Sequence, residues 1–159
     1  MLTDLDLHKI LFLDIETVPL YPNFEDAPEV EQRYFEEKTA YQRKENFSPQ
    51  EFYNRAGIWA EFGKIVCISV GYFGPQKKSR DFRLKTFKGE EATLLNEFKV
   101  LVEQYFNSPK HLFCGHNAKE FDFPFIARRM LIHQISIPKS LQLFNKKPWE
   151  VPHLDTLHL

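Results

Sequence analysis

The chain has 159 residues, 43% of them hydrophobic and sixteen of them phenylalanine, so it is long enough to bury a sizeable core. Its formal net charge of −1 excludes a general electrostatic attraction to nucleic acids, which would need local basic patches or metal ions instead. The sequence shows no signal peptide and no apolar run of membrane length, and Cys67 and Cys114 form neither a zinc motif nor a disulfide framework. We therefore expect one cytoplasmic domain over residues 1–159, with both thiols buried and reduced and with no membrane partner.

The first predicted element is a buried strand over residues 9–17, in which four apolar residues precede two carboxylates. Alternate side chains of a strand share a face, so Asp14 and Glu16 point the same way. Two close carboxylates repel unless a positive group lies between them, and a hard divalent cation such as Mg²⁺ or Mn²⁺ prefers such oxygen ligands. A strand that runs into an acidic turn is the alternative at this point, because Asp-x-Glu is short and common.

Residues 19–63 lack the alternation of a strand and predict a helical insertion after the first strand. Residues 29–44 carry charges of both signs, which is typical of an exposed helix, and Ser48 to Glu51 predict a capping box. The insertion also carries aromatic residues and three basic residues, Arg43, Lys44 and Arg55. It forms either a lid or a wall of a substrate groove, or a solvated helical excursion that packs Phe and Trp on the sheet edge, and the second interpretation is favoured.

A strand over residues 64–73 and an antiparallel partner over residues 80–87 follow the insertion. In the partner, Phe82, Leu84 and Thr86 alternate with Arg83, Lys85 and Phe87, and we expect the two cations on a solvated polar face. A helix then begins near Gly89, with Glu90 and Glu91 at its positive end, where carboxylates stabilise a helix. Its predicted core stripe consists of Leu94, Leu95, Phe98, Leu101, Val102, Tyr105 and Phe106.

The next predicted elements are a short strand at Phe113 and Cys114, a polar turn, and a helix over residues 121–133 with Asp122 at its start. Arg128 and Arg129 on this helix either meet a phosphate backbone or are solvated, and solvation is favoured for at least one. Residues 135–152 predict a loop with a helical turn at 139–144. Residues 151–159 predict a short strand, after which Asp155 is an N-cap candidate. This order of elements suits a mixed sheet with helices packed on it.

Two stretches resemble the first two motifs of the DEDD 3′–5′ exonucleases: Asp14-Ile15-Glu16-Thr17, and Gly115-His116-Asn117 followed by Phe121-Asp122-Phe123-Pro124-Phe125-Ile126. The resemblance is closest to the proofreading exonuclease domain of family B DNA polymerases, and it covers residues 9–17 and 65–159. It implies an α/β, ribonuclease H-like mixed sheet flanked by helices, with the helical insertion of residues 19–63 after the first strand.

The resemblance also implies three carboxylate ligands for two divalent cations, Mg²⁺ or Mn²⁺: Asp14, Glu16 and Asp122. Such ions, about 3.5–4 Å apart, activate a water for attack on a phosphodiester and stabilise the leaving 3′ oxygen. The backbone around Ile15 and Thr17 would meet the terminal nucleotide, and Asn117 and Phe121 would grip the single strand. Phe121 as the first core residue of its helix is an equal alternative, and His116 either flanks the site or, preferably, is a turn residue.

The third motif of that family, a Tyr or His with an Asp four residues later, has no counterpart in this sequence, because Asp155 is the only aspartate after Asp122. We therefore expect a C-terminally truncated piece of a metal-dependent 3′–5′ exonuclease, impaired in cleavage, with Asp155 in a structural role. The expected partner is the 3′ end of single-stranded DNA, although nothing visible reads a 2′-hydroxyl and RNA stays open. The alternative is a catalytically inactive single-stranded nucleic-acid-binding or scaffolding domain of the same fold. A polymerase or repair partner is also left open.

Overall fold

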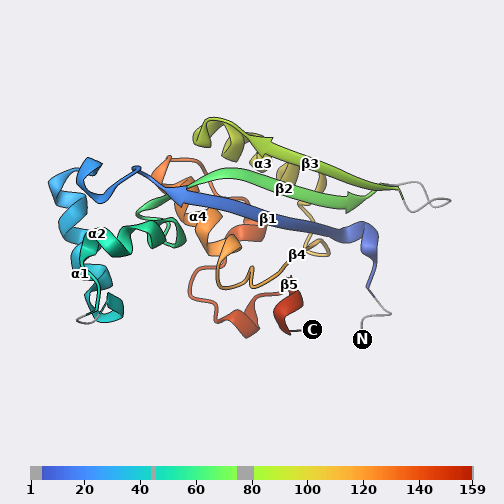
Figure 1. Cartoon of the computed structure of the whole chain (residues 1–159). Coiled ribbons are helices and arrows are strands. Elements are labelled where there is room, and N and C mark those ends of the chain that lie inside the picture. Colours follow the sequence, from blue (N-terminus) through green and yellow to red (C-terminus); the bar gives the residue numbers. More distant parts are fainter. Residues whose placement is uncertain (1–4, 44–45, 75–80, 159) are drawn as a thin grey trace. The chain divides into compact units, whose positions relative to one another are not determined.

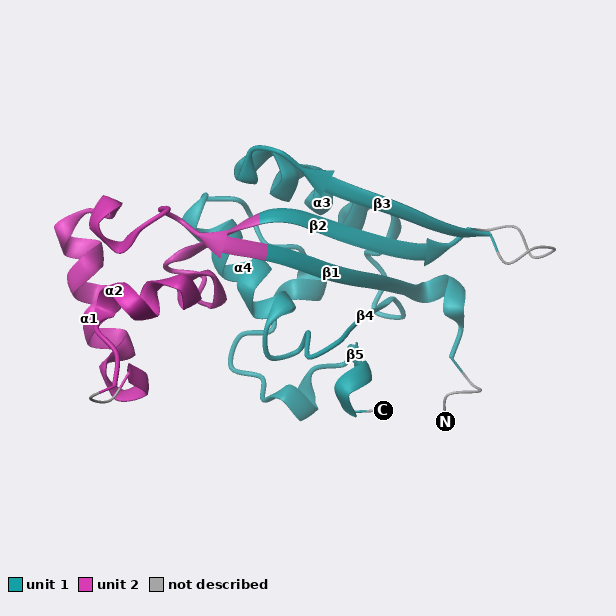
Figure 2. Cartoon of the chain, viewed as in Figure 1, with its two compact units in different colours: residues 1–16, 66–159 teal, residues 17–65 magenta. Residues whose placement is uncertain are grey.

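The computed structural model describes residues 5–43, 46–74 and 81–158. The chain forms two compact units, one of residues 1–16 and 66–159 and the other of residues 17–65 (Figure 2). The first unit is built on a mixed sheet, and the second is mainly helical. None of the helices in the described part of the chain has the length and apolar character needed to cross a membrane.

Five strands form one sheet in the order β3-β2-β1-β4-β5 (Figure 1). Their bounds are Ile10–Pro19 for β1, Gly63–Phe73 for β2, Phe82–Lys88 for β3, Leu112–Gly115 for β4 and Leu154–Asp155 for β5. β2 and β3 pair antiparallel, whereas β1 pairs parallel with β4 and β4 pairs parallel with β5. The predicted α/β architecture with a mixed sheet is therefore confirmed. The carboxyl ends of β1, β4 and β5 meet at one edge of the sheet.

Two helices, α3 (Glu91–Tyr105) and α4 (Asp122–Ile132), pack on one face of this sheet. The ring of Phe98 on α3 meets Phe87 of β3 with centroids 6.0 Å apart, and Phe123 on α4 meets Phe113 of β4 at 5.9 Å. All four rings are buried, and each contributes roughly 1.5–3 kcal/mol by leaving water. The predicted core stripe of α3 is confirmed except for Tyr105, which is exposed.

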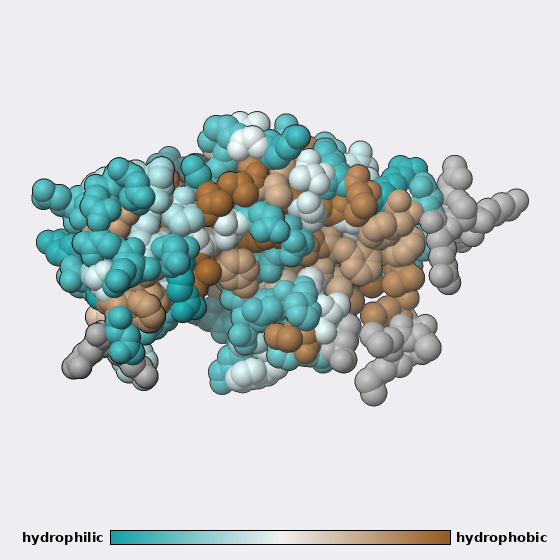
Figure 3. Space-filling model, viewed as in Figure 1, coloured by the Kyte–Doolittle hydropathy of each residue, from teal (hydrophilic) through white to brown (hydrophobic). Residues whose placement is uncertain are grey.

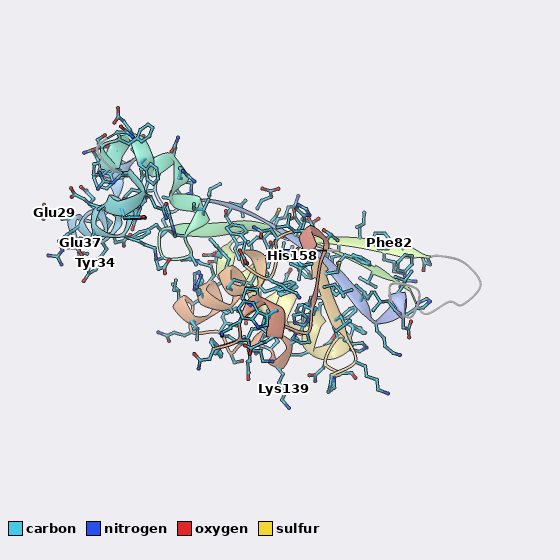
Figure 4. All side chains as sticks on the ribbon, turned by 90° about the horizontal axis from the view of Figure 1, so that it is seen from below. Glu29, Tyr34, Glu37, Phe82, Lys139 and His158 are labelled. Atoms are coloured by element: carbon cyan, nitrogen blue, oxygen red, sulfur yellow. The ribbon has the colours of Figure 1, made fainter. Side chains whose placement is uncertain are left out.

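The opposite face of the sheet presents apolar side chains to the solvent, as Figure 3 shows. The rings of Phe12, Phe73 and Phe82 contact one another there, with centroids 5.0 Å apart for Phe73 and Phe82 and 5.9 Å for Phe12 and Phe82. Phe82, labelled in Figure 4, is 44% exposed and the next residue on its face, Leu84, is 77% exposed. Phe82 and Leu84 of β3 thus face the solvent.

The prediction that Arg83 and Lys85 are solvated is confirmed, because both residues are exposed. These two residues alternate onto the side of buried Phe87, which packs on α3. The Lys85 ammonium lies 4.5 Å from the centroid of the Phe87 ring, and the Arg83 guanidinium pairs with Asp81 at 2.8 Å. Both cations remain exposed at their ends, because long cationic side chains cover apolar surface while keeping the charge in water.

The second unit contains α1 (Glu29–Arg43), α2 (Pro49–Phe52) and two 3₁₀ helices, η3 (Phe24–Asp26) and η4 (Tyr53–Ile58). The aromatic residues that were expected to pack on a sheet edge form a core of their own with Ala56: Phe24, Phe35, Phe52, Tyr53 and Phe62. Phe35 is its centre, with ring centroids 5.1 Å from Tyr53 and 5.3 Å from Phe62. The outer side of α1 carries Glu29, Tyr34 and Glu37, which are exposed (Figure 4).

Local hydrogen bonds fix the ends of the helices in this unit. The predicted capping box is confirmed, since the Ser48 hydroxyl accepts from the Glu51 amide at 3.3 Å and the Glu51 carboxylate accepts from the Ser48 amide at 2.9 Å. Arg43 is buried and donates to the Thr39 hydroxyl and to two backbone carbonyls, so it closes α1 and is unavailable as a groove cation. Lys44 lies outside the described residues, and Arg55 lies over the ring of Phe52.

The described part of the first unit also contains four 3₁₀ helices: η2 (Leu7–Lys9), η5 (Lys139–Leu141), η6 (Pro148–Glu150) and η7 (Thr156–His158). The helical turn predicted over residues 139–144 is thus shorter and ends at Leu141. Both cysteines are free thiols in strands. Cys114 is buried as expected, whereas Cys67 is only half-buried.

Candidate carboxylate site

Asp122 lies at the first residue of α4 and is 3% exposed. Its Oδ1 accepts a hydrogen bond from the backbone amide of Ile15 on β1 at 3.1 Å. This contact joins residues 107 positions apart in the chain. The two sequence motifs therefore meet in space, because the start of α4 is tied to the acidic end of β1.

The pKa of Asp122 is raised from its ordinary value of 3.8 to about 6. Burial is the largest cause, and the negative charges of Asp14 and Asp155 add to it, while the Ile15 amide acts in the opposite direction. Carboxylates with raised pKa values that lie beside other carboxylates are typical of functional sites. Asp122 thus occupies a region of negative potential in which an added cation would be stabilised.

Asp14 and Glu16 are exposed on one face of β1, and Ile15 between them is buried, as strand alternation predicts. Asp14 lines a shallow groove of about 360 Å³ that crosses the solvent-facing side of the sheet. Aromatic and small side chains complete this groove, among them Phe12, Gly71, Phe82 and His116. Of the predicted site residues, Asp14 is the one that lines this groove and whose charge also raises the pKa of Asp122.

Two of the three predicted ligands, Asp14 and Asp122, suit a divalent cation by their oxygen donors and by their mutual repulsion. Within residues 5–43, 46–74 and 81–158, no group of three or more His, Cys, Asp or Glu side chains is arranged to hold a metal ion. The ligand set of Asp14, Glu16 and Asp122 implied by the resemblance therefore stays a prediction.

Asp155, at the end of β5, fixes the turn that leads to Asp122. Its Oδ1 accepts from the Asn117 amide at 2.7 Å and from the Leu157 amide at 3.0 Å, and its Oδ2 accepts from the Lys119 amide at 3.0 Å. Burial works to raise the pKa of Asp155, but these three donors outweigh it and hold the pKa below the ordinary value. The expected structural role of Asp155 is confirmed, including its N-cap bond to η7.

The remaining predicted substrate residues occupy different environments. The Ile15 amide is taken by Asp122, so this N–H is already engaged, and Thr17 lies half-buried in the second unit. Asn117 adopts a positive φ of 59°, which suits asparagine, and its carbonyl accepts from the Phe121 amide at 3.0 Å. Phe121 is half-buried against Phe125, with centroids 5.4 Å apart, so its ring combines a packed side with an exposed one.

His116 borders the groove beside Asp14 and also takes part in the turn. Its Nδ1 lies 2.9 Å from the Thr156 hydroxyl, which in turn donates to the Gly115 carbonyl at 3.2 Å. Gly115 is required there, because a Cβ at this position would lie 2.5 Å from the Cβ of Ala118 and 3.0 Å from the Leu13 carbonyl. Both interpretations of His116 from the sequence thus apply at once.

The sequence reasoning missed the aromatic side of the groove. Phe12 follows Leu11 in an unbroken apolar run, and such a run does not distinguish the two faces of a strand. The alternation of side chains could have placed Phe12 on the same face as Asp14. Phe82 was expected to be a strand residue, and its place in the groove depends on the pairing of Phe73 with Phe82.

No protein-family model matches this chain, and no curated protein matches it.

Proposed function

We propose that this chain is a metal-dependent phosphodiester hydrolase that removes nucleotides from the 3′ end of single-stranded nucleic acid, on a ribonuclease H-like fold. The observation that carries the proposal is the contact of Asp122 with the Asp14–Glu16 segment of β1. It joins two motifs that resemble those of the DEDD exonucleases, and burial together with the charge of Asp14 raises the pKa of Asp122. Ribonucleic acid and deoxyribonucleic acid both suit such a site, and DNA is the substrate we favour.

In this proposal Asp14 and Asp122 hold a divalent cation, and Glu16 joins them when substrate is bound. Bound Mg²⁺ or Mn²⁺ would supply an activated water and stabilise the leaving 3′ oxygen. The amide of Ile15 keeps the Asp122 carboxylate oriented, since it donates a hydrogen bond to Oδ1. The exposed rings of the groove offer stacking surfaces for the terminal base beside Asp14.

A gel assay tests this function directly. The chain is incubated with 5′-labelled single-stranded DNA in Mg²⁺, Mn²⁺ or EDTA, beside Asp14→Asn, Asp122→Asn and the matched control Glu97→Gln, an exposed carboxylate on α3. We expect a ladder that shortens from the 3′ end and disappears in EDTA. Each aspartate substitution should slow cleavage by more than about 100-fold, because even outer partners of a metal site cost about 10- to 100-fold.

The control variant should cleave like the unsubstituted chain. A ladder that persists in EDTA, or one that Asp14→Asn leaves unchanged, would contradict the proposal. We expect slow cleavage overall, because the third motif of the family has no counterpart in this sequence.

A second function is favoured by the incomplete carboxylate cluster. A domain of this fold that binds single strands without cleaving them would need no third ligand. It would bind labelled single-stranded DNA equally well in EDTA and Mg²⁺, and Asp14→Asn would leave that binding unchanged or strengthen it by removing a negative charge. Binding without any ladder in Mn²⁺ would therefore select this function over hydrolysis.

A further inference from the structure

A second hollow lies on the first unit, between the first turns of α4 and the segment that follows η5. It has a volume of about 300 Å³, at the lower end of the range of about 300–1,000 Å³ for small-ligand pockets. Its inner wall is apolar and buried, formed by Phe123, Ala127, Leu141 and Val151. A hollow of this size accommodates one nucleotide or a single side chain and excludes a duplex.

The rim of this pocket is cationic. Lys119, Arg128 and Lys146 line it, and no Asp or Glu does so in the described part of the chain. None of the three cations forms an ion pair with a carboxylate of the described residues, so all three charges are available to a ligand. The charges of Lys119 and Lys146 also help to keep His153 neutral, after burial as the main cause of its lowered pKa. A positive potential therefore covers this side of the pocket.

An aromatic ring with an open face completes the pocket. Phe144 lines it and is 58% exposed, whereas Phe123 is fully buried and has no free face. The segment that carries Phe144 is held in place by turns, since the Lys146 amide donates to the Leu143 carbonyl and the Lys147 amide donates to the Glu150 carboxylate. Hydrogen bonds within this segment thus hold Phe144 and Lys146 at the edge of the pocket.

We propose that this pocket binds one nucleotide of a single strand, with Phe144 stacking on the base and Lys119, Arg128 and Lys146 contacting the phosphates. Aromatic platforms combined with a cationic rim are the usual means of holding single strands without sequence preference. Arg128 adds a planar donor pair that matches a phosphate. This inference rests on the proposed function for its ligand class, and it supplies a second contact on the strand whose 3′ end is at Asp14.

The pocket adjoins Asp122 in the chain, which supports the binding of one nucleic-acid strand by both sites. Lys119 belongs to the turn that Asp155 fixes, three residues before Asp122, and Phe123 and Pro124 of the pocket directly follow Asp122. One short segment of chain therefore carries both the buried carboxylate and part of the pocket.

Binding of a 5′-labelled oligothymidylate of twelve nucleotides, followed by fluorescence anisotropy in EDTA, tests this inference without cleavage. Phe144→Ala should weaken binding by about 5- to 100-fold, the effect typical of one lost base stack. The triple variant Lys119→Gln, Arg128→Gln, Lys146→Gln should weaken it further and reduce the slope of log affinity against log salt by about 2, since each phosphate contact on a single strand contributes about 0.7. Lys110→Gln, an exposed lysine before β4, is the matched control and should bind like the unsubstituted chain.

The inference would be overturned if the unsubstituted chain did not bind the oligonucleotide, or if the variants bound it with unchanged affinity and salt slope. Thymidine monophosphate as competitor separates a free nucleotide from a strand, because a strand site should prefer the oligonucleotide by more than tenfold. Preference for an acidic peptide of matched charge would replace nucleic acid by a protein partner and also overturn it. Failure of the cleavage assay with intact pocket-dependent binding would instead contradict only the proposed hydrolysis.

Discussion

The buried carboxyl group of Asp122 makes the free energy of unfolding depend on pH. Its carboxyl group is 3% exposed and has a pKa of about 6, above the ordinary value of 3.8, so the folded chain holds this proton more tightly than the unfolded chain. Between these two values the folded state binds more protons, and the free energy of unfolding therefore falls as pH rises from about 4 to above 6. The loss amounts to about 3 kcal/mol at most, at about 1.4 kcal/mol for each pH unit between the two pKa values.

Asp122→Asn should remove this pH dependence, because the amide oxygen still accepts from Ile15 and carries no charge. We expect the variant to be more stable than the unsubstituted chain at pH 7.5, by up to about 3 kcal/mol, and to match it near pH 4. Urea unfolding between pH 4 and 7.5 measures this difference. The exposed neighbour Glu120→Gln serves as control, and an advantage of Asp122→Asn that is equally large at pH 4 would contradict the assignment.

At this scale the sequence predicted positions better than partners. Asp14, Glu16 and Asp122 stood out by their place after a strand and at a helix start, and Asp155 stood out as an N-cap. The contact between the Ile15 amide and Asp122 was beyond prediction, since it joins residues 107 positions apart. Glu16 shows the limit of the alternation rule, which assigns a face and leaves the distance to other groups undetermined.

The helices α3 and α4 are joined by a buried ionic group that the sequence reasoning did not find. Arg129 on α4 donates from Nε to the Glu91 carboxylate of α3 at 2.9 Å, and His133 lies 2.7 Å from the same carboxylate. Arg129 and Glu91 are both buried. Removal of one partner of a buried ion pair is costly, because the other charge remains away from water.

Arg129→Met should destabilise the chain by about 3–5 kcal/mol, because Glu91 would lose its buried guanidinium partner. Arg128→Met is a matched control on the adjacent residue, which is exposed and should change stability by no more than about 0.5 kcal/mol. Chemical denaturation of both variants at one pH measures the contrast. Equal effects of the two substitutions would show that the α3–α4 pair is not held by this contact.

The two arginines also show why the element scale was only partly predictable. Both were considered as phosphate contacts or solvated cations, yet Arg129 lies on the buried side of α4 with Phe125, Ile126 and Met130. The spacing of these apolar residues placed Arg129 in their stripe, and this was a usable signal. Glu91 offered no such signal, because an acidic residue in the first turn of a helix is expected at the surface.

For the molecule as a whole, the division into two compact units makes stability a local property. Residues 17–65 have a core of aromatic residues centred on Phe35, separate from the core between the sheet and its two helices. The sequence predicted a helical insertion there but no core, because aromatic residues without a regular period do not indicate what they pack against.

Phe35→Ala should cost about 3–5 kcal/mol in the second unit, since its ring fills the centre of that core. Hydrogen exchange followed by mass spectrometry should show faster exchange in residues 17–65, with little change in α3 and α4. Tyr34→Ala, on the adjacent exposed residue of α1, should leave exchange unchanged. Equally faster exchange in both units would mean that they unfold as one.

The two edge strands of the sheet, β3 and β5, affect how readily this chain aggregates at high concentration. The unpaired backbone groups of an edge strand can pair with strands of other molecules, which leads to aggregation. Proteins reduce this risk with short edge strands and with lysine side chains on them. β5 has two residues, and β3 carries the exposed cations Arg83, Lys85 and Lys88. Both edge strands therefore disfavour aggregation by strand addition. We expect self-association at high concentration to involve the apolar solvent-facing side of the sheet instead.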